Sequence, residues 1–232
     1  MRKIIDPGLF SKQVAADTKR GEFNFKNAVI VENDVKVDFV FIGDSITDFW
    51  EINAYLGESN KMVINRGIGG DTTEFVLKRF DADVVQLKPK HCILMIGIND
   101  AWDLEDDPWT QKKGIDIEDV ISRAYCNIYE MIKKAKENNI NLILCSILPT
   151  NMEFTNKNKE RNSYVLGVNK KLKAVSNKEE LIYVNYYSAF VENGQTYVKD
   201  GLTAEGLHPN TKGYNIMIEV LRNTLLENDI IL

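Results

Sequence analysis

Residues 40–47, with the sequence VFIGDSIT, place a serine directly after a short run of apolar residues. Such a run is typical of a strand in a parallel sheet that is covered on both faces, and the glycine and aspartate that follow indicate a turn. Ser45 therefore stands at the carboxyl end of the first predicted strand. Ligands bind outside these strand ends in open parallel sheets, so this position suits a nucleophile.

The rest of the chain alternates short apolar runs with longer amphipathic stretches. Continuous apolar runs suit buried parallel strands, and residues at helical spacing separate them. The pattern predicts strands at residues 35–42, 62–65, 92–96, 141–147 and 181–184, and helices at 72–87, 117–137, 164–175 and 215–227. This order predicts a three-layer α/β/α fold, with about five parallel strands and helices on both faces of the sheet.

The domain organisation follows from what separates the motifs. Between them there is no Pro/Gly/Ser-rich linker, repeat or low-complexity run, so residues 35–232 are expected to form a single domain. Residues 1–34 are expected to be an N-terminal extension packed on that domain. A helix is predicted around residues 11–20, with an extended piece near residues 28–32. This extension is also a plausible place for contacts in a homo-oligomer.

Composition excludes several classes of partner and location. The formal net charge of −5 and the pI near 5.3 argue against a nucleic-acid surface. The chain contains neither a secretory signal nor an apolar stretch of about 18 residues, so membrane insertion is not expected. The three cysteines lie in apolar patterns, which indicates buried, reduced thiols and a cytoplasmic protein: Cys92, Cys126 and Cys145.

The two histidines of the chain differ in where they stand relative to the predicted strands. His91 immediately precedes the third strand, at its amino end and so on the rim opposite Ser45. His208 lies in the loop before the last helix. An imidazole, with its ordinary pKa near 6.5, can accept a serine proton at neutral pH. His208 is therefore the predicted base for Ser45.

Other polar groups at the strand ends suit the remaining needs of acyl transfer. An oxyanion requires preorganised donors, and the candidates are the Ser45 backbone N–H, the Gly70 backbone N–H and the Asn99 side-chain amide. A carboxylate that orients the histidine is also expected, and Glu205, three residues before His208, is the nearest candidate. Asp200, or a serine–histidine dyad helped by backbone carbonyls, remains an alternative.

Four blocks of the sequence resemble, in order and spacing, those of the SGNH hydrolases, the GDSL-type esterases and lipases. They are residues 43–46 (GDSI), 65–72 (NRGIGGDT), 97–100 (GIND) and 205–209 (EGLHP). The resemblance covers roughly residues 35–228 and implies a flavodoxin-like fold and ester hydrolysis through an acyl-serine intermediate. It implies Ser45 as nucleophile, Gly70 and Asn99 in the oxyanion hole and His208 as base, with no metal or organic cofactor. Glu205 stands where the family usually has Asp.

The loops indicate the substrate less strongly than the four blocks indicate the reaction. Asp44 is a candidate for substrate binding, although stabilising the turn is its simpler role. Trp50, Trp102 and Trp109 are candidates for substrate binding, although packing is the simpler role for each of them. The polar loop at residues 150–162 lacks an apolar lid, which favours short acyl groups such as acetyl on a carbohydrate or another small polar carrier.

Alternative functions follow from the same fold. A lysophospholipase or thioesterase of the same family stays open. A non-catalytic binding module is disfavoured, because every catalytic position is filled. A flavodoxin-like nucleotide or flavin binder is also disfavoured, because the strand-end loops lack a phosphate cradle.

Overall fold

The computed structural model describes residues 5, 7, 8, 14–57, 59–106, 111 and 113–232. Its centre is a five-stranded parallel sheet in the order β2-β1-β3-β4-β5, which is the flavodoxin-like order. The strands are β1 (Phe39–Gly43), β2 (Val63–Gly67), β3 (His91–Met95), β4 (Asn141–Cys145) and β5 (Ile182–Val184). The structure thus confirms the predicted three-layer α/β/α fold, with all five strands close to the predicted positions.

Two compact units make up the chain. The first contains Met1–Ile96 and Asn127–Ile143, and the second contains Gly97–Cys126 and Leu144–Leu232. Helix α5 (Ile117–Glu137) begins in the second unit and ends in the first, and its bounds are those predicted. The predicted division into residues 1–34 and 35–232 stays a prediction.

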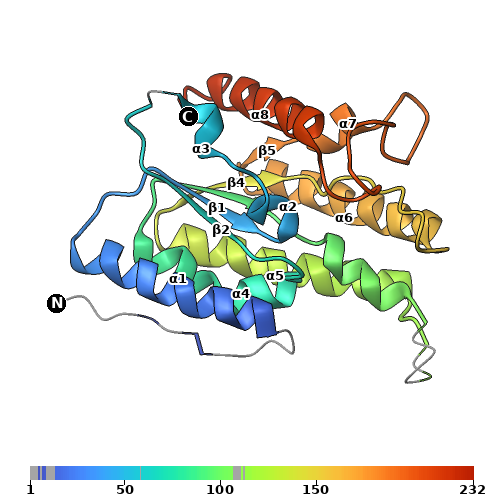
Figure 1. Cartoon of the computed structure of the whole chain (residues 1–232), viewed down its shortest axis with the longest axis horizontal. Coiled ribbons are helices and arrows are strands. Elements are labelled where there is room, and N and C mark those ends of the chain that lie inside the picture. Colours follow the sequence, from blue (N-terminus) through green and yellow to red (C-terminus); the bar gives the residue numbers. More distant parts are fainter. Residues whose placement is uncertain (1–4, 6, 9–13, 58, 107–110, 112) are drawn as a thin grey trace. The chain divides into compact units, whose positions relative to one another are not determined.

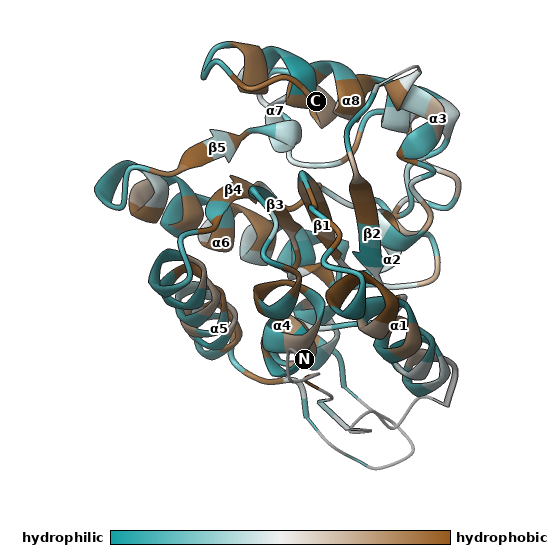
Figure 2. Cartoon of the chain, turned by 90° about the vertical axis from the view of Figure 1, so that its left-hand side faces the viewer, coloured by the Kyte–Doolittle hydropathy of each residue, from teal (hydrophilic) through white to brown (hydrophobic). Residues whose placement is uncertain are grey.

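The first unit is built around β1, which is buried along its whole length. β1 pairs in parallel with β2 and β3, so that Gly43 lies opposite Gly67 on one side and Met95 on the other. Figure 2 shows these strands hydrophobic over most of their length, with a hydrophilic tip on β2. The helical segments of the first unit are α1 (Val14–Glu32), α2 (Ser45–Asp48), α3 (Asn53–Leu56), α4 (Thr73–Asp83) and η1 (Val85–Leu87).

Helix α1 runs beside α4 and contacts η1 (Figure 1). It continues to Glu32, so the extended piece predicted near residues 28–32 was wrong. Its buried positions Phe23, Asn27 and Val31 are four residues apart, which is the spacing of one helix face. The β-branched residues at the end of this segment suggested a strand, but burial of that face determines the helix.

The second unit carries η2 (Ile98–Leu104), α6 (Asn158–Lys178), α7 (Tyr186–Phe190) and α8 (Thr211–Leu226). Helix α6 packs on η2 and β5, and α8 packs on α7 and β5. Asn210 caps α8, because its side-chain oxygen accepts hydrogen bonds from the backbone N–H groups of Lys212 and Gly213. This cap starts the helix at Thr211, four residues before the predicted start at residue 215.

The three cysteines are free thiols, but they differ in burial. Cys92 and Cys145 are buried, as predicted, whereas Cys126 is exposed on α5. Burial raises the pKa of Cys145 to about 12, which makes this thiol a poor nucleophile at neutral pH. Among the helices of the described residues, none has the length and apolar character that crossing a membrane requires.

Candidate active site

Ser45 is the first residue of α2, immediately beyond the carboxyl end of β1. Asp44 is the N-cap of this helix, and its carboxylate accepts a hydrogen bond from the Ile46 backbone N–H at 2.9 Å. Asp44 is buried, so it stabilises the turn, as its sequence position favoured. A Cβ at Gly43 would overlap the Met95 carbonyl oxygen and the Thr47 side chain. The turn that presents Ser45 therefore requires glycine at this position.

The loop after β2 lies at the same edge of the sheet, because β1 and β2 are parallel and end together at Gly43 and Gly67. The Ile68 backbone N–H donates to the Gly43 carbonyl at 3.1 Å and joins this loop to the nucleophile turn. Gly70 has a φ of +80°, a left-handed conformation that glycine adopts without strain. The structure thus places Ser45 and Gly70 in one unit, on two adjacent strand-end loops.

Arg79, on α4, connects these two loops through hydrogen bonds of its side chain. Its guanidinium donates to the Gly43 carbonyl at 2.9 Å and to the Arg66 carbonyl at 2.9 Å, which are the backbone positions just before each loop. It also binds the carboxylates of Asp71 at 2.7 Å and Asp83 at 2.8 Å. Although burial opposes its charge, the two carboxylates outweigh this effect and raise the pKa of Arg79 above its ordinary value. The side chain is fully buried and charged.

Helix α1 contributes two further ion pairs to the same region. Arg20 binds Asp71, which directly follows Gly70, and both side chains are 1% exposed. Lys19 binds Asp48, the last residue of α2. The N-terminal helix therefore contacts both the nucleophile helix and the loop of the expected oxyanion donor. The two partners of Asp71, Arg20 and Arg79, show that this carboxylate braces the loop after β2.

In the second unit, Asn99 lies in η2, which begins directly after Gly97. The Asn99 side chain is nearly buried. The hydroxyl of Tyr164 on α6 donates to the Gly97 carbonyl at 2.8 Å and fixes the start of this segment. Burial raises the pKa of Tyr164 well above its ordinary value, so the hydroxyl stays a donor at neutral pH.

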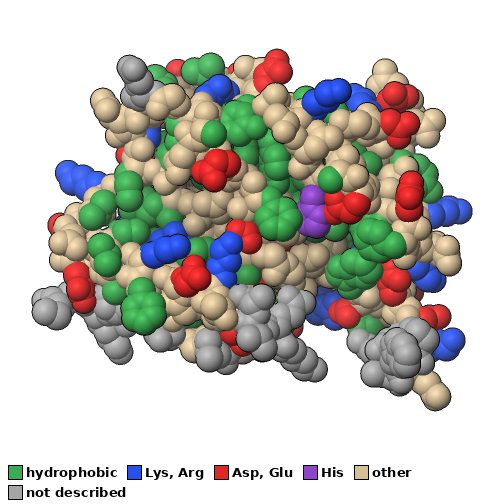
Figure 3. All heavy atoms as spheres, in the orientation of Figure 1, with side chains coloured by type: hydrophobic (Ala, Val, Ile, Leu, Met, Phe, Trp, Pro, Cys, Tyr) green, Lys and Arg blue, Asp and Glu red, His purple; other side chains and the backbone are tan. Residues whose placement is uncertain are grey.

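His208 and Glu205 are brought together in the loop before α8. The Nδ1 atom of His208 is in contact with the Glu205 carboxylate, and both side chains are partly exposed. Figure 3 shows a histidine beside an acidic side chain at the surface. Asp200, the alternative acid, lines a cavity that Glu205 also borders. A carboxylate at Nδ1 holds the imidazole in the orientation in which Nε2 is the atom that accepts a proton.

The candidate substrate-binding tryptophans have different environments. Trp50 is 2% exposed and packs edge-on against Phe41 of β1, which favours an anchoring role over substrate contact. Trp102 is 42% exposed, and its ring stacks on Phe154 with centroids 6.3 Å apart. The Arg161 guanidinium lies 3.8 Å from the Trp102 ring centroid. Trp109 lies outside the described residues.

Sequence reasoning missed Arg79, Arg20 and Phe154 as contributors to these regions. Arg79 did carry a signal, since a charged residue stood at a position of the apolar stripe of its helix. In the part of the chain that the structure describes, no group of three or more His, Cys, Asp or Glu residues is placed to hold a metal ion.

The family model of the GDSL-like lipase/acylhydrolase family matches residues 41–216. The chain belongs to this family. It is therefore a carboxylic ester hydrolase, from a family in which a catalytic triad and an oxyanion hole are characteristic features.

Three relatives illustrate the similarity. An acetylxylan esterase from Geobacillus stearothermophilus is 24% identical over 201 residues, which cover 77% of this chain and 89% of that protein. The uncharacterized lipoprotein YqeF of Bacillus subtilis (strain 168) is 35% identical over 91 residues, covering 39% of this chain and 34% of that protein. The solved structure of a GDSL-like lipase from Bacteroides thetaiotaomicron VPI-5482 is 25% identical, with a TM-score of 0.74 and coverage of 90% and 97%.

Proposed function

We propose that this hydrolase cleaves short-chain esters, acetyl groups on a carbohydrate or similar polar carrier, through an acyl-serine intermediate at Ser45. The observation that carries the proposal is the contact between Glu205 and Nδ1 of His208. An imidazole held in this way is oriented to take the proton of a serine. Ser45 stands at the start of a helix directly after β1, which is the position that the family resemblance assigns to the nucleophile.

In the proposed reaction, Nε2 of His208 accepts the Ser45 hydroxyl proton while Oγ attacks the acyl carbon. The Ser45 and Gly70 backbone N–H groups and the Asn99 amide donate to the oxyanion that forms. The intermediate collapses, the carbon–oxygen bond to the alcohol breaks, and His208 returns its proton to the alcohol oxygen. Water then attacks the acyl-serine by the same steps, which releases the acid and restores Ser45.

Chain connectivity supports the role of Asn99. β3 pairs with β1 so that Met95 lies opposite Gly43, and Asn99 follows only four residues after Met95. Membership of the family supports the joint action of Ser45 and His208, which lie in different units. The acetylxylan esterase relative supports an acetyl group on a carbohydrate.

The proposal extends to the predictions on organisation and partners. Residues 35–232 act as one catalytic domain, with residues 1–34 packed on it. The protein is cytoplasmic, binds small esters rather than nucleic acid or membranes, and can form a homo-oligomer. A lysophospholipase or thioesterase activity is the second candidate within the same mechanism.

Turnover of p-nitrophenyl acetate and labelling by a fluorophosphonate test the mechanism directly. Ser45→Ala is expected to lower kcat by about 10⁵-fold and to abolish labelling, because the nucleophile is lost. Ser163→Ala, at an exposed position of α6, is the matched control and should keep both signals. Unchanged turnover or labelling in Ser45→Ala would overturn the proposal, and absence of both signals in the wild type would favour a non-catalytic module.

A series of acyl chains from C2 to C12, measured beside acetylated sugars, tests the acyl preference. We expect kcat/KM to be highest at C2 and to fall as the chain lengthens. If kcat/KM is instead highest at C8 or longer, the enzyme is a lysophospholipase rather than an acetyl esterase.

A further inference from the structure

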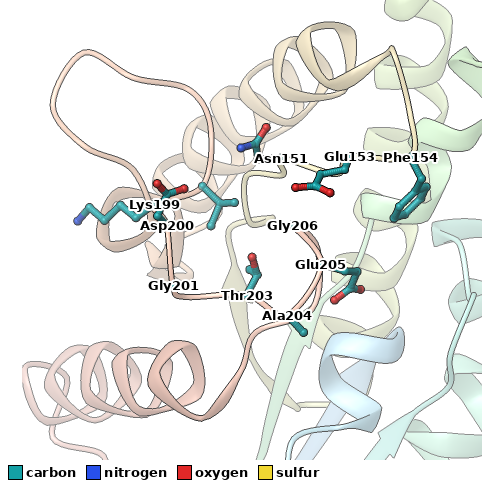
Figure 4. A pocket seen from close by; sticks show the side chains of 11 residues that line it. Asn151, Glu153, Phe154, Lys199, Asp200, Gly201, Thr203, Ala204, Glu205 and Gly206 are labelled. Atoms are coloured by element: carbon teal, nitrogen blue, oxygen red, sulfur yellow. The ribbon is translucent and has the colours of Figure 1, made fainter.

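A cavity of about 560 Å³ lies in the second unit, beside the loop that carries His208. Glu205 and Gly206 form part of its wall, and Glu205 is the residue in contact with His208. The opposite wall comes from the segment after β4, whose Asn151 backbone N–H donates to the Gly206 carbonyl at 2.8 Å. Figure 4 shows both walls around the opening. The cavity therefore borders the proposed proton carrier directly.

This location fits the alcohol part of an ester. In the proposed mechanism, His208 gives its proton to the alcohol oxygen when the carbon–oxygen bond breaks. The alcohol must therefore lie on the His208 side of the site, while the acyl oxygen lies at the oxyanion donors. The cavity wall next to Glu205 is the part of the second unit where a carrier attached to that oxygen has space.

The lining has the side chains that bind sugars. Phe154 is 62% exposed and offers an aromatic surface, and the hydroxyl of Thr203 and the amide of Asn151 offer hydrogen bonds. Phe154 is held in advance, since it stacks on Trp102, which in turn lies against the Arg161 guanidinium. A side chain that is already ordered loses little freedom when a ligand binds. A polyhydroxylated ring with one apolar face matches this combination.

The charged residues of the lining restrict which sugars fit. The carboxylates of Glu153, Asp200 and Glu205 line the cavity. Lys199 also belongs to the lining, but its ammonium donates to the Ala189 carbonyl at 3.1 Å and points away from the cavity in Figure 4. In that view the Glu153 and Thr203 side chains point inward. Carboxylates accept hydrogen bonds from sugar hydroxyls and repel negative charge.

We propose that this cavity binds the alcohol part of the ester and selects sugars that carry no negative charge. The inference rests on the proposed function, because it assigns the carrier of the same ester. It adds where that carrier is bound, by which side chains, and which charge it must lack. Acetyl groups on neutral or amino sugars are then substrates, and acetyl groups on acidic sugars are poor ones.

Three acetylated methyl glycosides that differ in one substituent test the selection: a glucoside, a glucosaminide and a glucuronide. With wild-type enzyme, kcat/KM for the glucuronide should be about tenfold below that for the glucoside. The carboxylates of Glu153 and Asp200, the two in the lining other than the His208 partner Glu205, should each contribute about a threefold effect. The difference should shrink in 1 M salt, which screens exposed charges. Equal kcat/KM values for the three glycosides would overturn the inference.

Variants locate the effect in this cavity. Glu153→Lys should raise kcat/KM for the glucuronide about tenfold relative to the glucoside, whereas Glu219→Lys, an exposed position on α8 outside the lining, should leave the ratio unchanged. Phe154→Ala should raise KM for the glucoside about fivefold with little change in kcat. If both control and cavity variants change the ratio equally, the cavity is not the binding site.

Hydrolysis of p-nitrophenyl acetate distinguishes a failure of the proposed carrier site from a failure of the proposed function. This ester has no sugar, so its hydrolysis by the wild-type enzyme reports acyl transfer alone, and the control variant Glu219→Lys should stay within twofold of the wild-type rate. If wild-type enzyme hydrolyses it without any preference among the glycosides, only the carrier site is refuted. If it is not hydrolysed at all, the proposed function itself fails.

Discussion

The two regions that carry the candidate catalytic residues are built in opposite ways. The nucleophile region lies on buried strands and helices, and Arg79, which is fully buried, holds both of its loops. The base region is a loop in which His208 and Glu205 are 25% and 38% exposed. In the proposed mechanism, the loops that would bind the acyl part are thus held by a buried charge network, whereas the loop that would meet the carrier is exposed.

The largest expected effect comes from breaking the buried network. Arg79→Met keeps most of the side-chain volume but leaves Asp71 and Asp83 without their shared guanidinium. Because an uncompensated buried charge is costly, the free energy of unfolding should fall by about 3–5 kcal/mol. Urea unfolding at pH 7 measures this loss.

Two further substitutions provide reference values for the loss of stability in Arg79→Met. Arg20→Met should cost about 2 kcal/mol, since Asp71 keeps its bond to Arg79. Arg123→Met removes a partly exposed pair with Asp103 in the second unit and should cost less than about 1 kcal/mol. If Arg79→Met and Arg123→Met cost the same, the contrast between a buried and an exposed framework is wrong.

The base region should show the reverse pattern, a loss of activity with little loss of stability. Glu205→Gln keeps the shape but removes the charge that stabilises the imidazolium, so kcat for p-nitrophenyl acetate should fall about 10²-fold. This loss is much smaller than that of Ser45→Ala. Because the pair is exposed, the free energy of unfolding should change by less than about 1 kcal/mol.

The matched variant for this prediction is Asp200→Asn, which changes another acidic residue of the loop between α7 and α8. It should leave kcat for p-nitrophenyl acetate within twofold of wild type. A severe loss in Asp200→Asn together with full activity in Glu205→Gln would transfer the role of orienting acid to Asp200.

The same contrast explains what could be predicted from the sequence. Strands such as β1 and β3 were recognisable because short continuous apolar runs are typical of strands buried on both faces of a sheet. The contact between Glu205 and His208 was also predictable, because the two residues are only three positions apart in the sequence. Local spacing is enough in both cases.

Long-range ion pairs were beyond such reasoning. Arg20 and Asp71 are 51 residues apart, and nothing in the spacing of either residue names its partner. The stacking of Phe154 on Trp102 likewise depends on how two loops meet. For α1, the apolar residues near its end suited a strand equally well, and only the partners of its buried face decide between the two structures.

The smallest effect, a change with pH, distinguishes the two histidines. His91 is buried at the start of β3, where its ring stacks on Phe39 and its Nδ1 accepts a hydrogen bond from the Asn141 amide at 3.0 Å. Burial, with Lys90 nearby, lowers the pKa of His91. The unfolded chain therefore binds a proton more readily than the native protein does, and stability that is present above about pH 6.5 is lost as the pH falls below it.

Urea unfolding at several pH values from 8 to 5.5 gives the slope of the free energy of unfolding against pH, which measures this loss of stability. His91→Gln, in which the titrating group is absent, should lose less stability over this range than the wild type. His208→Gln, by contrast, should lose most of the turnover of p-nitrophenyl acetate, which His91→Gln should keep. A wild-type slope in His91→Gln would mean that folding does not lower the pKa of His91. In that case the pH dependence of unfolding must arise from other groups.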